Sequence, residues 1–109
     1  RFAGLPDDQY QVLAEKYCGG VPASLLTFEV NGGFDAAVRF YDALGLFKRL
    51  VNIGDAKSLA CHPASTTHRQ LTEEEQANAG VTQGMVRLCV GIEHEDDILA
   101  DLEQALNQA

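Results

Sequence analysis

Basic side chains are scarce in this sequence: its 109 residues include only eight lysines and arginines, against sixteen aspartates and glutamates. The formal net charge is therefore −8 at pH 7. Because binding to a phosphate backbone requires clustered lysine and arginine, this balance argues against nucleic acid as a partner. Long apolar runs are lacking too, since none approaches the roughly 20 residues that cross a bilayer. We expect neither a nucleic acid nor a membrane as a partner.

Cysteines and targeting signals are also few. The three cysteines, Cys18, Cys61 and Cys89, form an odd set without C-x-x-C spacing, which predicts free thiols in a reducing compartment. The N-terminal residues lack the basic region and apolar run of a secretory signal, so we expect a cytoplasmic location. The sequence begins with arginine rather than methionine, which we interpret as the sign of a fragment.

What is present is typical of a globular protein with one core, since 46% of the residues are apolar and 22% charged. Apolar spacing and cap signals predict helices over residues 5–20, 34–45, 72–80 and 95–109. Runs rich in β-branched and apolar residues predict extended segments over residues 23–30, 46–54, 55–63 and 84–93. Helices alternate with strands, but long parallel units are too few for a doubly wound sheet. The predicted fold class is therefore α+β, as a two-layer sandwich.

The same periodicities predict which side chains are buried. The helix over 34–45, with Gly45 as its C-cap, presents one apolar face made of Phe34, Ala37, Val38, Tyr41 and Leu44. The last helix presents an apolar stripe made of Ile98, Leu99, Leu102 and Leu106. In the strand over 84–93, alternation points four side chains to one face, namely Val86, Leu88, Val90 and Ile92. The third helix is expected to begin with a capping box formed by Thr72 and Glu75.

Residues 62–70 form a polar loop with two histidines, His62 and His68, between apolar runs. As metal ligands these histidines would join Cys61 and the distant His94, yet the spacing matches no common zinc pattern, and we predict no metal site. As nucleophiles, the hydroxyl groups of the loop lack a G-x-S-x-G elbow, and closeness in sequence does not give triad geometry. The pattern therefore favours histidines that hydrogen-bond to the backbone of a packed loop.

A second loop, Asn-Gly-Gly at residues 31–33, lies between a predicted strand and a predicted helix. Backbone amides at such a place can bind a phosphate. A tight turn from strand to helix explains the two glycines completely, so the pattern favours the turn.

Arg87 is unusual because it lies inside the most regular strand, between Val86 and Leu88. A guanidinium within a sheet is costly unless an anion meets it, and its planar fork suits a carboxylate bidentately. Alternation could equally place Arg87 on a solvent-facing side of the strand, beside Cys89. The residues alone leave both possibilities open.

Three stretches together, residues 24–33, 46–81 and 86–106, resemble one known family. They are similar to the C-terminal domain of the cysteine/methionine-metabolism enzymes that use pyridoxal 5′-phosphate. Within that family, the run NIGDAKSLACHPASTTH is most similar to the O-acetylhomoserine sulfhydrylases. Cystathionine lyases and synthases usually have a Ser-Leu-Gly-Gly-type run where this chain has VNIGDAKSL.

This resemblance implies the small domain of the fold-type-I aminotransferase architecture, with a mostly antiparallel sheet and helices on one side. Residues 24–109 would be the core of that domain, after a lead-in helix and linker over residues 1–23. A preceding large domain, absent from this sequence, would hold the pyridoxal 5′-phosphate. Because Lys16, Lys48 and Lys57 match none of the family's Schiff-base lysine motif, the resemblance implies no catalytic or cofactor-binding residue here. The 109 residues alone are expected to be inactive.

The resemblance also implies a substrate site. Arg87 matches the family arginine that grips the α-carboxylate of the amino acid substrate. Asn52 stands where relatives place a carboxylate-contacting serine, so its side chain or backbone amide would share that task. Thr67 matches a threonine that lines the same pocket, which makes the loop over 62–70 a pocket wall. Cys89 replaces a family serine and would be a weaker partner for a nearby polar group.

The activity implied for the parent enzyme is a γ-replacement. Sulfide or a thiol replaces acetate on O-acetyl-L-homoserine, which gives homocysteine or methionine in methionine biosynthesis. The parent would be a cytoplasmic homotetramer. Three alternatives are a cystathionine γ-synthase or γ-lyase, a non-catalytic module that binds small molecules, and an interaction domain in which Arg87 only decorates the surface.

Overall fold

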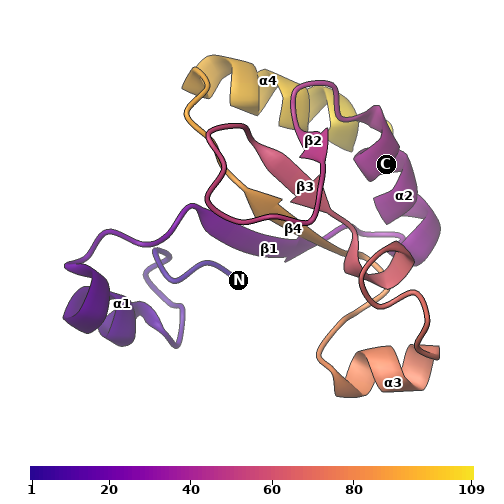
Figure 1. Cartoon of the computed structure of the whole chain (residues 1–109), viewed down its shortest axis with the longest axis horizontal. Coiled ribbons are helices and arrows are strands. Elements are labelled where there is room, and N and C mark those ends of the chain that lie inside the picture. The colour runs from indigo at the N-terminus through magenta and orange to yellow at the C-terminus, as the bar shows by residue number, and fades with distance from the viewer.

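The computed structural model describes residues 1–109, which form helices and strands in mixed order (Figure 1). The helices are α1 (Gln11–Cys18), α2 (Gly33–Ala43), α3 (Glu73–Asn78) and α4 (Glu95–Leu106). The strands are β1 (Leu25–Glu29), β2 (Lys48–Arg49), β3 (Leu59–Cys61) and β4 (Met85–Cys89), and a 3-10 turn, η1, covers Pro63–Ser65. None of these helices has the length and apolar character needed to span a membrane.

The four strands form one open sheet in the order β1-β4-β3-β2. β4 is antiparallel to both of its neighbours, β1 and β3, whereas β2 is parallel to β3. α2 and α4 contact each other and lie on the same side of the sheet (Figure 1). The predicted α+β class is therefore confirmed, with a mostly antiparallel sheet and helices on one side.

The core lies between this sheet and the two helices. Val86 and Leu88 point from β4 toward the helices and are at most 1% exposed. Phe28, the cross-strand partner of Val86, meets the ring of Phe40 from α2 edge-to-face, with centroids 5.5 Å apart. Complete burial of a side chain such as Phe40 contributes roughly 1.5–3 kcal/mol to the packing of α2 against the sheet. Since side chains alternate along a strand, Arg87 lies on the opposite face of the sheet.

The predicted strand over 46–54 is mostly wrong, because only Lys48–Arg49 pairs, at the edge of the sheet. The following residues turn away: the Asn52 side chain accepts the N–H of Ile53, which is typical of a turn. In β4 the alternation holds for Val86 and Leu88, but Ile92 is 85% exposed. Ile92 lies beyond the end of β4 at Cys89, where the ladder that sets the alternation has stopped.

The predicted buried faces of the helices are partly wrong. In α4, Leu99 and Leu106 are exposed, whereas Asp101 and Ala105 are buried. In α2, Phe34 is exposed and the buried residues are Ala36, Ala37 and Phe40. α2 also ends at Leu44 in an extended conformation, so Gly45 is not its left-handed C-cap. The capping box of Thr72 and Glu75 at the start of α3 is confirmed.

Asp101 explains how α4 holds the end of α2. Its Oδ1 accepts the N–H of Gly45 at 2.8 Å, and its Oδ2 accepts those of Leu46 at 2.9 Å and Phe47 at 3.1 Å. Gln104 Nε2 donates to Oδ1 at 3.0 Å and to the Ala43 carbonyl at 2.7 Å. One carboxylate thus accepts the N–H groups of the turn that follows α2, while Gln104 satisfies a free carbonyl at the end of the helix.

Candidate functional site

Arg87 lies in the middle of β4, between its cross-strand partners Thr27 of β1 and Cys61 of β3. The side chain is half-buried, and its Nη2 donates to the backbone carbonyl of Asn52 at 3.3 Å. A guanidinium has five N–H donors, and this is the one hydrogen bond that the Arg87 side chain makes. The ion pairs of the chain, Arg49–Asp42 and His94–Asp96, do not involve it. Arg87 therefore keeps its charge and most of its donors available to an external anion.

Asn52 is beside Arg87, in the irregular segment between β2 and β3. Its carbonyl oxygen faces the guanidinium, while its own Oδ1 accepts the N–H of Ile53 at 2.9 Å. The side chain is exposed but turned into its own loop. The structure thus brings together the two residues expected at one site, with the Asn52 carbonyl rather than its amide nitrogen in contact with the arginine.

Cys89 supports the same segment from the same face of the sheet. It follows Arg87 by two positions in β4, and its Sγ accepts the N–H of Gly54 at 3.4 Å. Ser24 Oγ lies 3.9 Å from the sulfur. The thiol is buried and free. As expected, a sulfur stands on the Arg87 side, where it is a weak acceptor for a polar group.

His62 begins the polar loop and is fully buried. Its Nε2 is 2.9 Å from the Gln83 carbonyl and its Nδ1 is 2.8 Å from Ser65 Oγ. Because a carbonyl can only accept, Nε2 carries a proton and donates it to Gln83, while Nδ1 shares a hydrogen bond with the Ser65 hydroxyl. Phe34 packs edge-to-face against the imidazole, with centroids 5.1 Å apart. The predicted histidine, hydrogen-bonded to backbone within a packed loop, is confirmed for His62.

Gln76 of α3 holds the rest of this loop and is a residue that sequence reasoning missed. It is 5% exposed, and its Nε2 donates to the carbonyls of His68 at 2.8 Å and Ala64 at 3.3 Å. Its Oε1 accepts from Gln83 Nε2 at 2.7 Å. Gln76 therefore holds two carbonyls of the loop in place, and η1 within the loop packs against β4.

The two loop threonines differ in their contacts. Thr67 is exposed, and its Oγ1 bonds to His68 Nδ1 at 2.8 Å. No hydrogen bond joins Thr67 to Arg87 or to Asn52. Thr66 instead folds back, with Oγ1 donating to the His62 carbonyl at 2.7 Å and lying 3.2 Å from the Sγ of Cys61. Cys61 is the residue directly opposite Arg87, so Thr66 anchors the loop next to the site.

The other sequence candidates do not converge on a site. No three His, Cys, Asp or Glu side chains lie close enough together to hold a metal ion. The distant His94 caps α4 instead, accepting the N–H of Asp96. Gly32 and Gly33 have φ values of 107° and 72°, which only glycine adopts readily, so the turn itself explains them. Arg87 lines none of the surface pockets of the chain.

The family model for Cys/Met-metabolism PLP-dependent enzymes matches residues 1–107. The O-acetyl-L-homoserine sulfhydrylase of Leptospira meyeri is 56% identical over 96% of this chain and 24% of its own length. The L-methionine γ-lyase of Pseudomonas putida is 54% identical over 78% of this chain and 21% of its own length. The chain spans about a quarter of the length of the curated relatives it matches.

A solved structure shares the fold. The crystal structure of an O-acetylhomoserine (thiol)-lyase from Campylobacter jejuni, which contains a pyridoxyl-lysine phosphate, matches with a TM-score of 0.86 at 43% identity. The match covers 97% of this chain and 25% of that one. The resemblance predicted from the sequence is therefore confirmed at the level of both sequence and fold.

Proposed function

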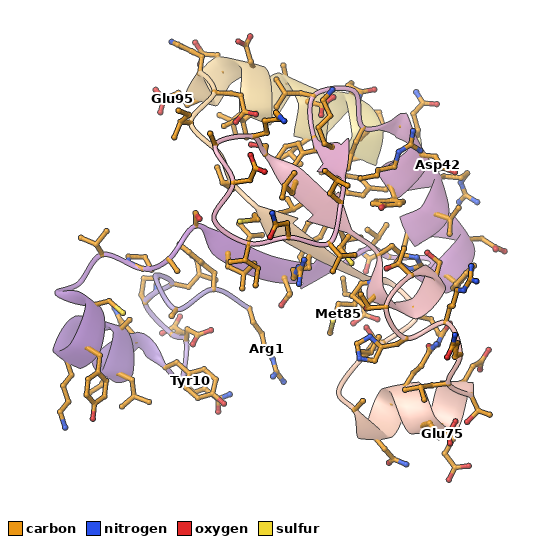
Figure 2. All side chains as sticks on the ribbon, viewed as in Figure 1. Arg1, Tyr10, Asp42, Glu75, Met85 and Glu95 are labelled. Atoms are coloured by element: carbon orange, nitrogen blue, oxygen red, sulfur yellow. The ribbon has the colours of Figure 1, made fainter.

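Because the chain belongs to the family of Cys/Met-metabolism pyridoxal-phosphate-dependent enzymes, we propose that it is the C-terminal small domain of such an enzyme. Residues 24–109 form its core and residues 1–23 its lead-in. The lead-in supports this proposal, since α1 buries none of its residues and stands apart from the sheet (Figure 1). Figure 2 shows Tyr10 beside α1, away from the sheet, and Tyr17 is 73% exposed. An apolar surface of this kind suits packing against a preceding large domain.

The activity proposed for the whole enzyme is that of an O-acetylhomoserine sulfhydrylase, which transfers the aminocarboxypropyl group of O-acetyl-L-homoserine to sulfide or a thiol. The observation that carries this chain's share is the unpaired guanidinium of Arg87. Arg87 would grip the α-carboxylate of the substrate through a bidentate pair, while the Asn52 carbonyl keeps the guanidinium in one orientation. Thr67 would contribute to the rim of the pocket, whose remaining walls belong to the large domain.

The cofactor itself does not fit the residues of this chain. A lysine that forms a Schiff base is activated by desolvation or by a cationic neighbour, but Lys16, Lys48 and Lys57 are all exposed. When bound to the large domain, pyridoxal phosphate would act as the electron sink that allows substitution at the γ-carbon. The task of Arg87 is positioning, because a fixed carboxylate fixes the orientation of the α-carbon.

A γ-lyase is the second candidate, favoured by the 54% identity to the Pseudomonas putida enzyme. Both activities use the same carboxylate anchor and differ in whether an external sulfur nucleophile attacks the γ-carbon. A cystathionine γ-synthase would prefer cysteine as this nucleophile. The choice of nucleophile therefore separates the candidates without changing the role of Arg87.

The first experiment uses the complete reading frame, purified with pyridoxal phosphate. We expect sulfide-dependent formation of homocysteine from O-acetyl-L-homoserine, with little product when cysteine replaces sulfide. Breakdown of methionine without added nucleophile would instead favour the γ-lyase. Absence of cofactor and turnover would favour a non-catalytic module.

Replacement of Arg87 tests the carboxylate anchor. Two hydrogen bonds between charged groups contribute about 3 kcal/mol together, so Arg87→Ala should raise the KM for O-acetyl-L-homoserine about 100-fold. Arg39→Ala, which removes an exposed arginine of α2, is the matched control and should leave KM unchanged. An unchanged KM in Arg87→Ala would remove the anchor role.

We also propose a homotetramer in the cytoplasm. The three cysteines are free thiols, two of them buried, which suits a reducing compartment. Size-exclusion chromatography with light scattering on the complete protein tests the assembly, and a mass other than four subunits would exclude it.

A further inference from the structure

The segment that carries Asn52, residues 50–57, has no regular structure but is attached to β4 and to the residues that follow β4. Near its start, the Asn52 carbonyl accepts a hydrogen bond from Arg87. In its middle, the Gly54 N–H donates to the Sγ of Cys89 in β4. Its end accepts the Ile92 N–H through the Ala56 carbonyl at 3.0 Å. We call this segment the 50–57 loop, and its attachments make its position depend on the C-terminal end of β4.

Ser58 fixes the end of the 50–57 loop and is fully buried. Glu93 holds it bidentately, with Oε1 accepting the Ser58 N–H at 2.7 Å and Oε2 accepting the Ser58 hydroxyl at 2.8 Å. The same hydroxyl oxygen accepts the Gly91 N–H at 2.9 Å. The Ser58 carbonyl accepts the N–H of Lys48 at 2.8 Å, so one residue joins β2 to the segment after β4.

Gly91 shows how tightly these groups are packed. A Cβ at this position would lie 2.4 Å from the Ala56 carbonyl oxygen and 2.5 Å from Glu93 Oε2. Real Cβ atoms do not approach other atoms so closely, so the loop, the glycine and the carboxylate contact one another without spare room. A change at the carboxylate is therefore transmitted to the loop rather than absorbed by a gap.

The hydrogen bond from the Ser58 backbone N–H lowers the pKa of Glu93 below its ordinary value, although desolvation opposes the shift. The carboxylate is consequently ionised at neutral pH and acts only as an acceptor, as both Ser58 donors require. No lysine or arginine forms an ion pair with Glu93. Lys48 adds a smaller electrostatic stabilisation of the carboxylate, so the main role of Glu93 is to hold Ser58.

We propose that Glu93, acting through Ser58, is a positioning residue for the 50–57 loop and thereby for the guanidinium of Arg87. The inference rests on the proposed function of Arg87 as the anchor for the substrate's α-carboxylate. When the Glu93–Ser58 contact is broken, the Asn52 carbonyl moves, and Arg87 loses the one protein group that orients it. Affinity for the carboxylate falls, whereas contacts with the rest of the substrate are unchanged.

The test compares two ligands that differ only in the carboxylate, L-norleucine and pentylamine, by calorimetric titration of the complete protein loaded with pyridoxal phosphate. Glu93→Gln keeps the shape of the side chain but replaces one acceptor oxygen by a donor. We expect Glu93→Gln to weaken the binding of L-norleucine about tenfold, which corresponds to about 1.4 kcal/mol, and to leave the affinity for pentylamine unchanged. Glu95→Gln, which removes an exposed charge two residues away, is the control and should change the affinity for neither ligand.

Two further measurements separate positioning from general stability. Ser58→Ala removes the other side of the same contact and should weaken L-norleucine to a similar extent. In steady state, Glu93→Gln should raise the KM for O-acetyl-L-homoserine about tenfold, with kcat within about twofold of wild type. A merely structural role would lower the melting temperature without this split.

Equal weakening of both ligands in Glu93→Gln, or no weakening of either, overturns the inference. Wild-type protein and Arg87→Ala show which proposal has failed. If wild type prefers L-norleucine and Arg87→Ala abolishes the preference, an unaffected Glu93→Gln overturns the positioning role alone. If wild type shows no preference for the carboxylate, the anchor role of Arg87 and this inference fall together.

Discussion

Replacement of Asp101 by asparagine is expected to destabilise the chain strongly, although the two side chains have nearly the same shape. Asp101 is 9% exposed, and its carboxylate accepts three backbone N–H groups and one side-chain amide. Each of its oxygens receives two donors. Whichever way asparagine is oriented, its NH2 group therefore faces donors where an acceptor is needed.

The magnitude follows from these contacts. At least one backbone N–H loses its acceptor, which costs about 1–3 kcal/mol for a buried group. The N–H groups that still bond to the remaining side-chain oxygen in Asp101→Asn have a neutral acceptor, and their hydrogen bonds are weaker than those to a carboxylate. We therefore expect Asp101→Asn to lower the free energy of unfolding by about 2–4 kcal/mol, comparable to breaking other buried charge contacts.

Urea unfolding of the 109-residue chain, followed by circular dichroism, measures this loss as a lower midpoint at an unchanged slope. Glu103→Gln makes the same chemical change on the exposed side of α4 and serves as the control. We expect the control to stay within about 0.5 kcal/mol of wild type. If Asp101→Asn matched the control, the carboxylate would not be what holds α4 to the end of α2, and the reasoning would be refuted.

Three further predictions concern acid stability and the two loops. Burial opposes ionisation of Asp101, but the N–H groups of Gly45, Phe47 and Leu46 together lower its pKa below the ordinary value. The ionised Asp101 therefore contributes fully to the free energy of unfolding above the ordinary carboxyl pKa, and this contribution is lost as the pH falls through the lowered pKa. We expect the free energy of unfolding to decline below about pH 4, with a smaller decline in Asp101→Asn. Gln76→Leu should cost about 2–3 kcal/mol in urea unfolding, because buried carbonyls lose their donor, whereas exposed Gln70→Leu should cost little; equal losses would contradict the bracing role. Cys89→Ala should speed amide hydrogen exchange at Gly54 about tenfold, and an unchanged rate would show that the sulfur does not hold the loop.

Local patterns were the part of the fold that the sequence could predict. The capping box of Thr72 and Glu75 depends on residues three positions apart, and it forms as expected. Val86 and Leu88 alternate inward because β4 has a strand on each side and helices on one face. The pattern that marks each feature spans only a few residues, so the sequence is sufficient to predict it, although the burial of Val86 and Leu88 itself needs distant partners.

Contacts between distant segments decided the rest. The strand predicted over 46–54 had the right composition, but β3 offers a partner to only two of its residues. Asp101 was overlooked because it is charged, although it shares the face of Ile98, Leu102 and Ala105 at the helical spacing i, i+3, i+4 and i+7. A charged residue in an otherwise apolar stripe was a signal of a buried acceptor, but its partners at 45–47 lie more than fifty positions away.

The candidate site shows the same division. Arg87 could be singled out by its place inside a strand, and Asn52 and Thr67 by resemblance alone. The structure joins Asn52 to Arg87 through a backbone carbonyl, which no side-chain pattern can reveal. The supporting residues Ser58 and Glu93 were not recognised, because their contact spans 35 positions and involves a serine that reads as an ordinary loop residue.

The charge distribution gives the strongest physical reason to regard Arg87 as a binding residue. The chain carries sixteen acidic side chains, yet none forms an ion pair with this half-buried arginine in the centre of the sheet. Two of the acids with lowered pKa values, Asp101 and Glu93, bind backbone amides instead. A structural arginine in so acidic a chain would be expected to find a carboxylate, since desolvating an unpaired guanidinium is costly. That cost is offset if the missing carboxylate comes from a ligand, which can reach the guanidinium because Arg87 is only half-buried.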